Sequence, residues 1–183
     1  MAAWLREILP GYYVVGCGRG ENGALAGEAM IVAFRTDKYN LIEMRTFWLS
    51  PTPWTPGSRY AVQSGCPRTA TELLLLEYAT GKVFRVVNTH LDHEGAPARQ
   101  LGLTQILHHL EDVQLFPDAP VILMGDFNAA MGSLCMNSVD EAGWTECAIT
   151  CSNSLDEFVI ADLLHQGAEI DVFGVGERLI TAR

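Results

Sequence analysis

The chain has 183 residues, 49% of them hydrophobic, which suits one globular domain over residues 1–183 and excludes a disordered protein. Its 22 acidic and 12 basic residues give a net charge of −10 without a lysine and arginine cluster, which disfavours tight sequence-independent binding to duplex DNA. There is no apolar run near the roughly 20 residues of a membrane helix and no signal-peptide pattern, and five scattered cysteines favour a reducing, cytoplasmic location.

The first part of the chain is predicted to form mainly strands. A short helix over residues 2–9 ends at Pro10-Gly11, and a glycine-rich loop follows at 19–27. The apolar patterns predict strands at 12–18, 28–35 and 39–50. The last two are joined by a turn near Asp37-Lys38, and the proline-rich stretch 50–58 is predicted to be a loop.

The second part alternates strands with a helix. Residues 70–79 and 82–90 predict a hairpin across Thr80-Gly81. Residues 95–113 predict a helix with Pro97 in its first turn and one apolar stripe formed by Leu103, Ile106, Leu107 and Leu110. Strands follow at 121–126 and 168–173, with no clear pattern between 131 and 168. The mixture predicts an α+β or layered α/β sandwich.

The stretch "VILMGDFNAA", residues 121–130, joins an apolar strand to polar residues. Val121–Met124 is typical of a strand that is buried on both faces. Side chains two apart on an extended chain point the same way, so Asp126 and Asn128 are predicted to share one side. Either a functional site or a turn explains them, since Asp and Asn also favour turns.

A second strand, in "VVNTHLDHEG" at 86–95, also ends in polar residues. On an extended chain His90 lies on the same side as Asn88 and Asp92. A single histidine there is compatible with a structural role. Metal sites built from His90 and His93, or from the pair at 108–109, lack a third ligand at a recognisable spacing. The pair at 108–109 is predicted to lie on a helix surface.

Several motifs occur together in order: "GE" at 27–28, "FWLSPTP", "PR" at 67–68, "NTHLDH", "AR" at 98–99 and "GDFNA". In this combination the chain resembles the endonuclease/exonuclease/phosphatase superfamily, which has the fold of deoxyribonuclease I, and in particular its bacterial branch of family hydrolases. The resemblance implies a four-layer α/β sandwich of two mixed β-sheets flanked by helices. It also implies hydrolysis of a phosphoester with Mg²⁺ or Mn²⁺.

The resemblance also implies roles for individual residues. Asp126 would orient and deprotonate the attacking water, and Asn128 would hold the phosphate or the metal shell. His90 would donate to a phosphate oxygen, with Glu28 as its acidic partner. Arg68 would bind substrate, and Asp171 matches the Asp of a family strand. Taken alone, Glu28 could be a loop-end acid, Arg68 a solvated residue and Asp171 a surface acid.

The chain departs from the family pattern at both ends. We expect the family's first and last strands to be missing, and with them the principal metal ligands and a histidine that meets the phosphate. Mg²⁺ held by Asp126 and Asn128 should therefore bind weakly, and activity should be weak or lost. The alternative is a non-catalytic remnant or interaction module. The expected partners are a small phosphoester rather than duplex DNA, and a second copy paired through exposed sheet edges.

Overall fold

The structure, a computed structural model, describes residues 10–20, 28–130, 133–144, 150–152, 162, 165 and 172–174. It divides the chain into two compact units, Met1–Asn128 and Ala129–Arg183, which are described separately. The predicted helix at 2–9, most of the glycine-rich loop, and Asp171 lie outside the described residues.

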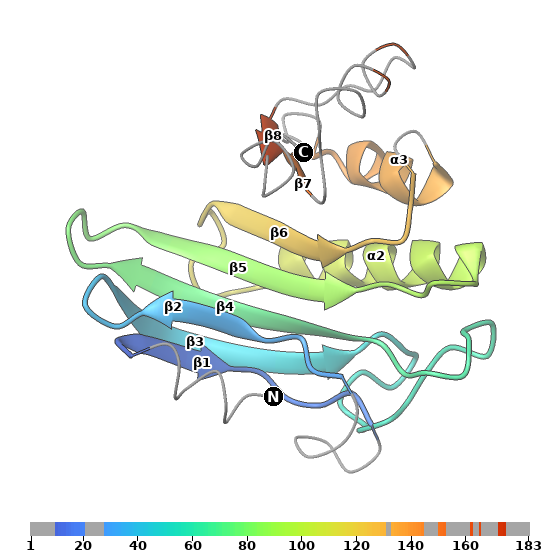
Figure 1. The fold of residues 1–183 in the computed structure, drawn as a ribbon, viewed down its shortest axis with the longest axis horizontal. Coiled ribbons are helices and arrows are strands. Elements are labelled where there is room, and N and C mark those ends of the chain that lie inside the picture. The colour runs from blue at the N-terminus through green and yellow to red at the C-terminus, as the bar shows by residue number, and fades with distance from the viewer. Residues whose placement is uncertain are drawn as a thin grey trace, which may run out of the picture. The chain divides into compact units, whose positions relative to one another are not determined.

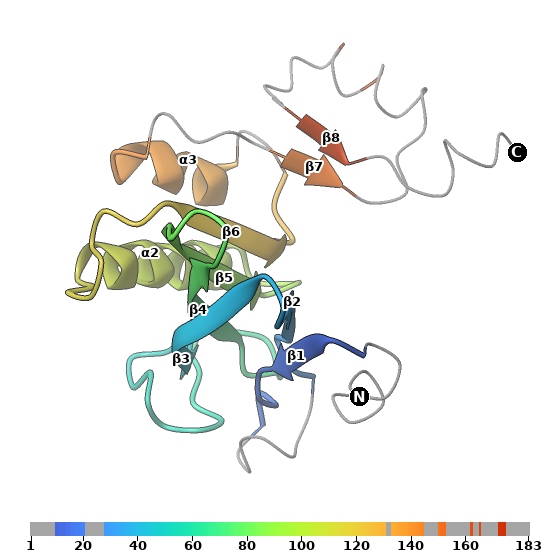
Figure 2. The same ribbon diagram turned by 90° about the vertical axis from the view of Figure 1, so that its left-hand side faces the viewer.

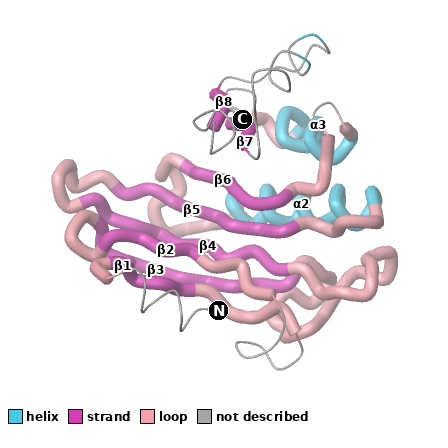
Figure 3. The backbone as a smooth tube through the Cα atoms, in the orientation of Figure 1, coloured by secondary structure: helices cyan, strands magenta, loops and turns pink. Residues whose placement is uncertain are grey.

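A four-stranded sheet forms the centre of the first unit, in the order β3-β4-β5-β6 (Figure 1). Its strands are β3 (Tyr39–Trp48), β4 (Thr69–Glu77), β5 (Val83–His90) and β6 (Val121–Asp126). The pairs β3–β4 and β4–β5 are antiparallel, and β5–β6 is parallel. The predicted hairpin at 70–90 is therefore confirmed. The long connection between β3 and β4, which includes the predicted proline-rich loop, is drawn as loop in Figure 3.

The strands β1 (Tyr12–Val15) and β2 (Val32–Arg35) form a second, antiparallel sheet. The turn near Asp37 thus joins strands of two different sheets, although the sequence there looks like an ordinary hairpin turn. The sheets pack face to face. Val32 and Phe34 of β2 share one buried cluster with Leu73 and Leu75 of β4. Burial of such side chains stabilises the fold by about 1.5–3 kcal/mol each, so this layer fixes β2 over β4.

The helix α2 (Ala96–Glu111) covers the opposite face of the four-stranded sheet, as Figure 2 shows. Alternation along β4 explains this arrangement, because Leu73 faces the β1–β2 sheet while its neighbour Glu72 faces the helix and contacts His109. The predicted apolar stripe is confirmed, and all four of its residues are buried. Two sheets and one helical layer match the predicted sandwich.

The predicted burial of β6 on both faces is wrong. The side chains of Ile122 and Met124 are 51% and 38% exposed. Among the described residues β6 is hydrogen-bonded only to β5, and it forms an edge of the four-stranded sheet. An apolar run predicts two covered faces only where a second layer extends over the strand. The two-stranded sheet lies over β4 and β5. Its buried cluster includes Val86 of β5 but no residue of β6, so this sheet does not cover β6.

In the second unit the structure describes α3 (Leu134–Glu141), β7 (Thr150–Ser152) and β8 (Val172–Gly174). Ser133 caps α3 by accepting a hydrogen bond from the Met136 amide at 3.4 Å. The strands β7 and β8 pair in parallel, and β8 falls at the end of the predicted strand at 168–173. In neither unit does a described helix have the length and apolarity to cross a membrane.

Candidate functional site

The predicted site residues of the first unit lie at one end of the four-stranded sheet. The carboxyl ends of β5 and β6 and the start of β4 meet there, beside the long loop that precedes β4 (Figure 1). His90, the last residue of β5, is paired in register with Asp126, the last residue of β6. Arg68 immediately precedes β4. The topology thus brings His90, Asp126 and Arg68 to the same edge.

His90 lies between two carboxylates. Its Nδ1 atom is 3.6 Å from Glu28 Oε2, and its Nε2 atom is 3.8 Å from Asp126 Oδ2. Both are ion-pair distances slightly longer than a hydrogen bond. The His90 side chain is 25% exposed, whereas those of Glu28 and Asp126 are 55% and 65% exposed. The two acids therefore sit at the mouth of the site, with the imidazole between them.

Burial lowers the pKa of His90 below its usual 6.5, and the positive charge of Arg68 lowers it further. The charges of Asp126 and Glu28 act in the opposite direction but are outweighed. His90 is therefore neutral at pH 7, with one ring nitrogen that carries a proton and one that can accept a proton. A neutral imidazole at this position can donate a hydrogen bond to a phosphate oxygen.

Asp126 and Asn128 form a turn at the end of β6. Asn128 has a positive φ of 48°, and its backbone N–H donates to Asp126 Oδ1 at 3.0 Å. Its side-chain amide donates to the Leu91 carbonyl at 3.1 Å. The chain is therefore not extended at Asn128, so the extended geometry from which a shared side was predicted does not apply there. The turn interpretation holds, and it leaves the Asp126 carboxylate exposed beside His90.

Gly125 makes the close approach of β5 and β6 possible. Its φ of +136° is a conformation that side chains disfavour, and a Cβ atom there would overlap the Thr89 carbonyl oxygen of β5. Replacement of Gly125 would push the strands apart just before His90 and Asp126.

Arg68 is buried, with 3% of its side chain exposed, so its interpretation as a solvated strand-start residue is wrong. Its Nη2 atom donates to His93 Nδ1 at 2.8 Å. The nearest charge partner is Asp92, whose Oδ2 lies 3.9 Å from Arg68 Nε, which is too far for a hydrogen bond. The Nε and Nη1 atoms of Arg68 are buried without a hydrogen-bond acceptor.

The Asp92 carboxylate is occupied by other donors. Its Oδ2 accepts from the Ser64 backbone at 3.0 Å and from the Ser64 hydroxyl at 2.6 Å. Its Oδ1 accepts from the amides of Glu94 at 3.0 Å and Gly95 at 2.7 Å. Burial raises the pKa of Asp92, but these hydrogen bonds outweigh it and lower the pKa to about 2.

Arg19 belongs to the same group of side chains but was not found from the sequence. Its Nη1 atom lies 2.8 Å from Glu28 Oε2, and its side chain is only 13% exposed. The Arg19 carbonyl accepts a hydrogen bond from Trp48 Nε1 at 2.7 Å, which anchors this part of the loop to β3. An arginine close before the predicted Glu28 was the signal available in the sequence.

The described residues do not assemble a complete magnesium site. No group of three or more His, Cys, Asp or Glu that could hold a metal occurs among them. Asp126 offers one exposed carboxylate, and Asn128 offers a carbonyl oxygen, since its amide nitrogen is already bound to Leu91. Mg²⁺ prefers six oxygen ligands and one or two carboxylates, so this donor set is sparse.

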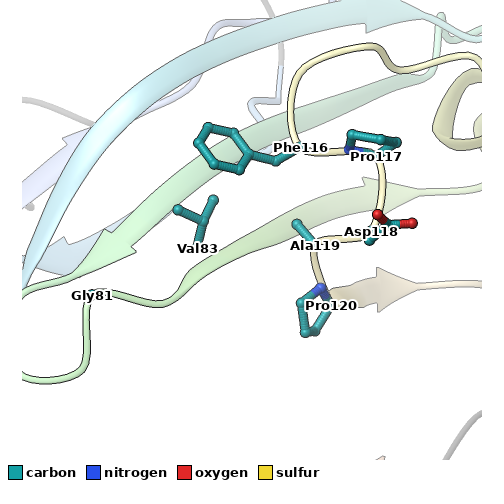
Figure 4. A pocket seen from close by; sticks show the side chains of 7 residues that line it. All are labelled: Gly81, Val83, Phe116, Pro117, Asp118, Ala119 and Pro120. Carbon is teal, nitrogen blue, oxygen red and sulfur yellow. The ribbon is translucent and has the colours of Figure 1, made fainter.

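A pocket of about 400 Å³ lies at the opposite ends of β5 and β6 from these residues (Figure 4). Gly81 and Val83 line it from the start of β5, together with residues 116–120 from the loop before β6. Asp118 is the only titratable side chain among the lining residues. This pocket therefore lacks the acid, histidine and arginine combination found at the carboxyl ends of the strands.

The profile of the Endonuclease/Exonuclease/phosphatase family matches residues 30–134, which is more than half of the chain. The chain belongs to this family. The matched region includes β2 to β6 and α2, and with them Arg68, His90, Asp126 and Asn128. Arg19 and Glu28 lie shortly before it.

Solved structures of the family have the same fold. A family protein from Bacteroides thetaiotaomicron is 30% identical, with a TM-score of 0.70 over 78% of this chain and 50% of that chain. The mannosyl-6-phosphatase of the same organism is 28% identical, with a TM-score of 0.73 over 85% of this chain and 58% of that chain. The family protein from Bacteroides vulgatus is 32% identical, with a TM-score of 0.69 and coverages of 81% and 57%. The chain thus spans little more than half the length of these structures, and the predicted α/β sandwich is confirmed.

A curated protein of another class matches a short stretch. Nicotinate phosphoribosyltransferase of Bacillus subtilis is 54% identical over 44 residues, which are 24% of this chain and 9% of that protein.

Proposed function

We propose that the protein hydrolyses a small phosphoester, with a phosphomonoester such as a sugar phosphate as the preferred class of substrate. The observation that carries the proposal is the position of His90 between the carboxylates of Glu28 and Asp126, beside a buried arginine with unpaired N–H groups. A base, a neutral hydrogen-bond donor and a cation are the groups that phosphoryl transfer to water requires.

In the proposed reaction a bond forms between the oxygen of water and phosphorus, and the bond from phosphorus to the leaving oxygen breaks. The carboxylate of Asp126 takes a proton from the attacking water. His90 donates a hydrogen bond to a phosphate oxygen, with Glu28 as the acid that orients its ring. Arg68 offers its N–H groups to the phosphate. The departing oxygen takes a proton from solvent, and the products are an alcohol and phosphate.

The choice of a small substrate rests on charge and on one relative. A net charge of −10 without a basic stripe does not favour the duplex DNA backbone. The relative from Bacteroides thetaiotaomicron with 28% identity is a mannosyl-6-phosphatase. A sugar phosphate combines a compact anion with a neutral sugar. This suits a site whose positive charge is concentrated at Arg68 rather than spread along a surface.

The proposed site is expected to bind its metal weakly. The sparse oxygen donors at Asp126 and Asn128 lead us to expect millimolar affinity for Mg²⁺ or Mn²⁺ at best. Turnover should then be about 10³-fold or more below that of a family member with all its ligands, as expected for losses within cooperating sites. Asp171, which the family resemblance adds as a catalytic acid, lies outside the described residues.

The alternative is a non-catalytic family member. The observation behind it is the sparse set of oxygen donors that Asp126 and Asn128 offer among the described residues. Turnover of mannose 6-phosphate and of plasmid DNA in Mg²⁺ or Mn²⁺ separates the two. We expect phosphate release that is lost in Asp126→Asn and no faster nicking of plasmid. Release at an unchanged rate in Asp126→Asn would not arise at this site and would favour the non-catalytic alternative.

A further inference from the structure

Unpaired hydrogen-bond donors gather at the candidate site. In the described part of the chain, the buried side-chain atoms without a hydrogen-bond partner are Arg19 Nη1, Arg68 Nε, Arg68 Nη1 and the hydroxyl of Thr69. Three of these four atoms belong to two guanidinium groups. A buried donor without an acceptor costs about 1–3 kcal/mol, and more when it is charged, so such a pair of arginines needs an explanation.

Two nitrogens of Arg68 lack an acceptor because the neighbouring carboxylate of Asp92 already accepts hydrogen bonds at both oxygens. Both oxygens of Asp92 accept two hydrogen bonds each from Ser64, Glu94 and Gly95. The carboxylate can balance the charge of Arg68 from 3.9 Å, but it does not receive its N–H groups. These N–H groups are therefore free to bind an acceptor that enters the site.

Arg19 is held in place but is also incompletely bonded. Its backbone N–H donates to the Glu28 carbonyl at 2.9 Å, and its own carbonyl receives the Trp48 indole N–H. The Nη1 atom is 2.8 Å from Glu28 Oε2, yet the alignment is not that of a hydrogen bond. The same carboxylate oxygen lies 3.6 Å from His90, so Glu28 places Arg19 next to the imidazole.

The two guanidinium groups repel each other. Burial lowers the pKa of Arg68, and the positive charge of Arg19 lowers it further, while both arginines lower the pKa of His90. An anion of charge −2 relieves this repulsion better than an anion of charge −1. A phosphomonoester is dianionic near pH 7, whereas a phosphodiester carries one charge.

We propose that Arg19 is a second phosphate-binding residue, and that Arg19 and Arg68 together hold one dianionic phosphate, so that the site prefers phosphomonoesters to phosphodiesters. The inference rests on the proposed function for the location of the substrate. It adds a residue that no family motif identified and a reason for the substrate class.

The direct test is calorimetric titration of the whole chain with inorganic phosphate, which requires no turnover. Arg19→Gln and Arg68→Gln should each weaken phosphate binding by about 10-fold or more, because each removes a charge-assisted pair of hydrogen bonds. Arg35→Gln is the matched control. Arg35 is also paired with a carboxylate, that of Asp37, but lies on the surface, and its replacement should leave the Kd unchanged. Equal phosphate binding by Arg19→Gln and the native chain would overturn the inference.

A second readout measures ester preference. Arg19→Gln should lower kcat/KM for 4-nitrophenyl phosphate by about 10-fold or more and that for bis(4-nitrophenyl) phosphate by less, since the diester lacks the second charge. Equal losses for both esters would contradict the proposed preference. If the native chain hydrolyses neither ester, the proposed function fails, and the phosphate titration alone decides about Arg19.

If Arg19→Gln does not fold, Arg19→Lys replaces it, with phosphate binding expected to weaken by about 3-fold or more because lysine lacks the guanidinium fork. Unchanged binding by Arg19→Lys would then overturn the inference.

Discussion

Two clusters of charged side chains are buried on the four-stranded sheet, and they differ in the completeness of their hydrogen bonds. In the Glu72 cluster, Glu72 Oε1 receives Arg85 Nη1, and Glu72 Oε2 lies 2.7 Å from His109 Nε2. The Nη2 atom of Arg85 donates to the Leu115 carbonyl at 2.7 Å. In the Arg68 cluster, formed by Arg68, Asp92 and His93, the carboxylate is saturated while the guanidinium retains two unpaired nitrogens.

The difference in hydrogen bonding indicates which cluster serves stability and which could bind a ligand. A saturated buried ion pair has no capacity for a further ligand, and removal of one partner leaves the other charge buried and less well compensated. A guanidinium with spare donors carries a cost in the free protein that a bound anion removes. The arginine and the carboxylate are buried to the same degree in the two clusters, so the number of hydrogen-bonded atoms distinguishes the two pairs. The Glu72 cluster holds α2 to the sheet, whereas the Arg68 cluster keeps donors without partners, which suits the phosphate ligand proposed above.

The largest expected effect is on stability and comes from a substitution in the Glu72 cluster. Arg85→Met leaves the buried Glu72 carboxylate with His109 as its remaining partner in this cluster and should lower the free energy of unfolding by about 3–5 kcal/mol. Arg68→Met should lower it by less than about 1 kcal/mol, because Asp92 keeps its four hydrogen bonds and two unsatisfied donors disappear. Urea denaturation of both variants measures the two values. Similar losses in both would show that the clusters have the same role.

The second effect is on turnover. Asp126→Asn should lower kcat by about 10²-fold or more, since an amide cannot accept the proton of water. His109→Gln, which keeps an N–H donor near Glu72, should leave kcat within about 2-fold because it lies in the saturated cluster. Phosphate release from a sugar phosphate measures both. A large loss of kcat in His109→Gln would connect the Glu72 cluster to the reaction.

The third effect concerns acid stability. The folded-state pKa of Asp92 is about 2, against an ordinary 3.8, so its ionised form stabilises the fold above pH 3.8. This contribution, about 2 kcal/mol from the size of the shift, should disappear as the pH falls from 3.8 to 2. Asp92→Asn should remove it at every pH, and the difference in unfolding free energy from the native chain should therefore shrink below pH 3.8. A difference that stays constant down to pH 2 would contradict the hydrogen-bond assignment.

The smallest expected effect is a change in titration. The pKa of His90 lies below 6.5, so the neutral form is favoured in the folded chain, and folding loses stability as the pH falls through that pKa. Arg68→Gln removes one cause of the lowered pKa and should raise the pKa of His90, whereas Arg45→Gln, at a half-buried pair with Glu43, should not. Titration of the His90 ring protons by NMR tests this. An unchanged pKa in Arg68→Gln would show that the charge of Arg68 does not act on His90.

Local patterns predicted the elements more successfully than their partners. The leucine-rich β4 and the stripe on α2 were predicted correctly because their periodicity reflects burial against immediate neighbours. The position of β2 in a separate sheet was not predictable, since it depends on Phe34 packing against Leu73, far away in the sequence. Nor did the sequence predict that His109, expected on the helix surface, contacts the buried Glu72.

Part of the site was predictable for the same reason. His90 and Asp126 end strands that pair in register, so two local patterns converge through simple sheet geometry. Arg19 lies in an irregular segment without a motif, and its role follows only from atoms that lack partners. Asn128 shows the limit of the extended-chain argument, because the strand ends at Asp126 and the backbone turns before the amide.

Gly125 gives the site a particular vulnerability. Because the carbonyl of Thr89 occupies the space of a side chain at Gly125, this position tolerates no replacement that leaves the two strands where they are. The site therefore depends on the absence of a side chain at position 125 as well as on its polar groups. In a saturation library selected for phosphate release, glycine alone should survive at position 125, while neighbouring Met124, 38% exposed, accepts many residues. The tolerance of each β6 position to substitution would thus identify where β5 and β6 approach most closely, a feature that no catalytic motif shows.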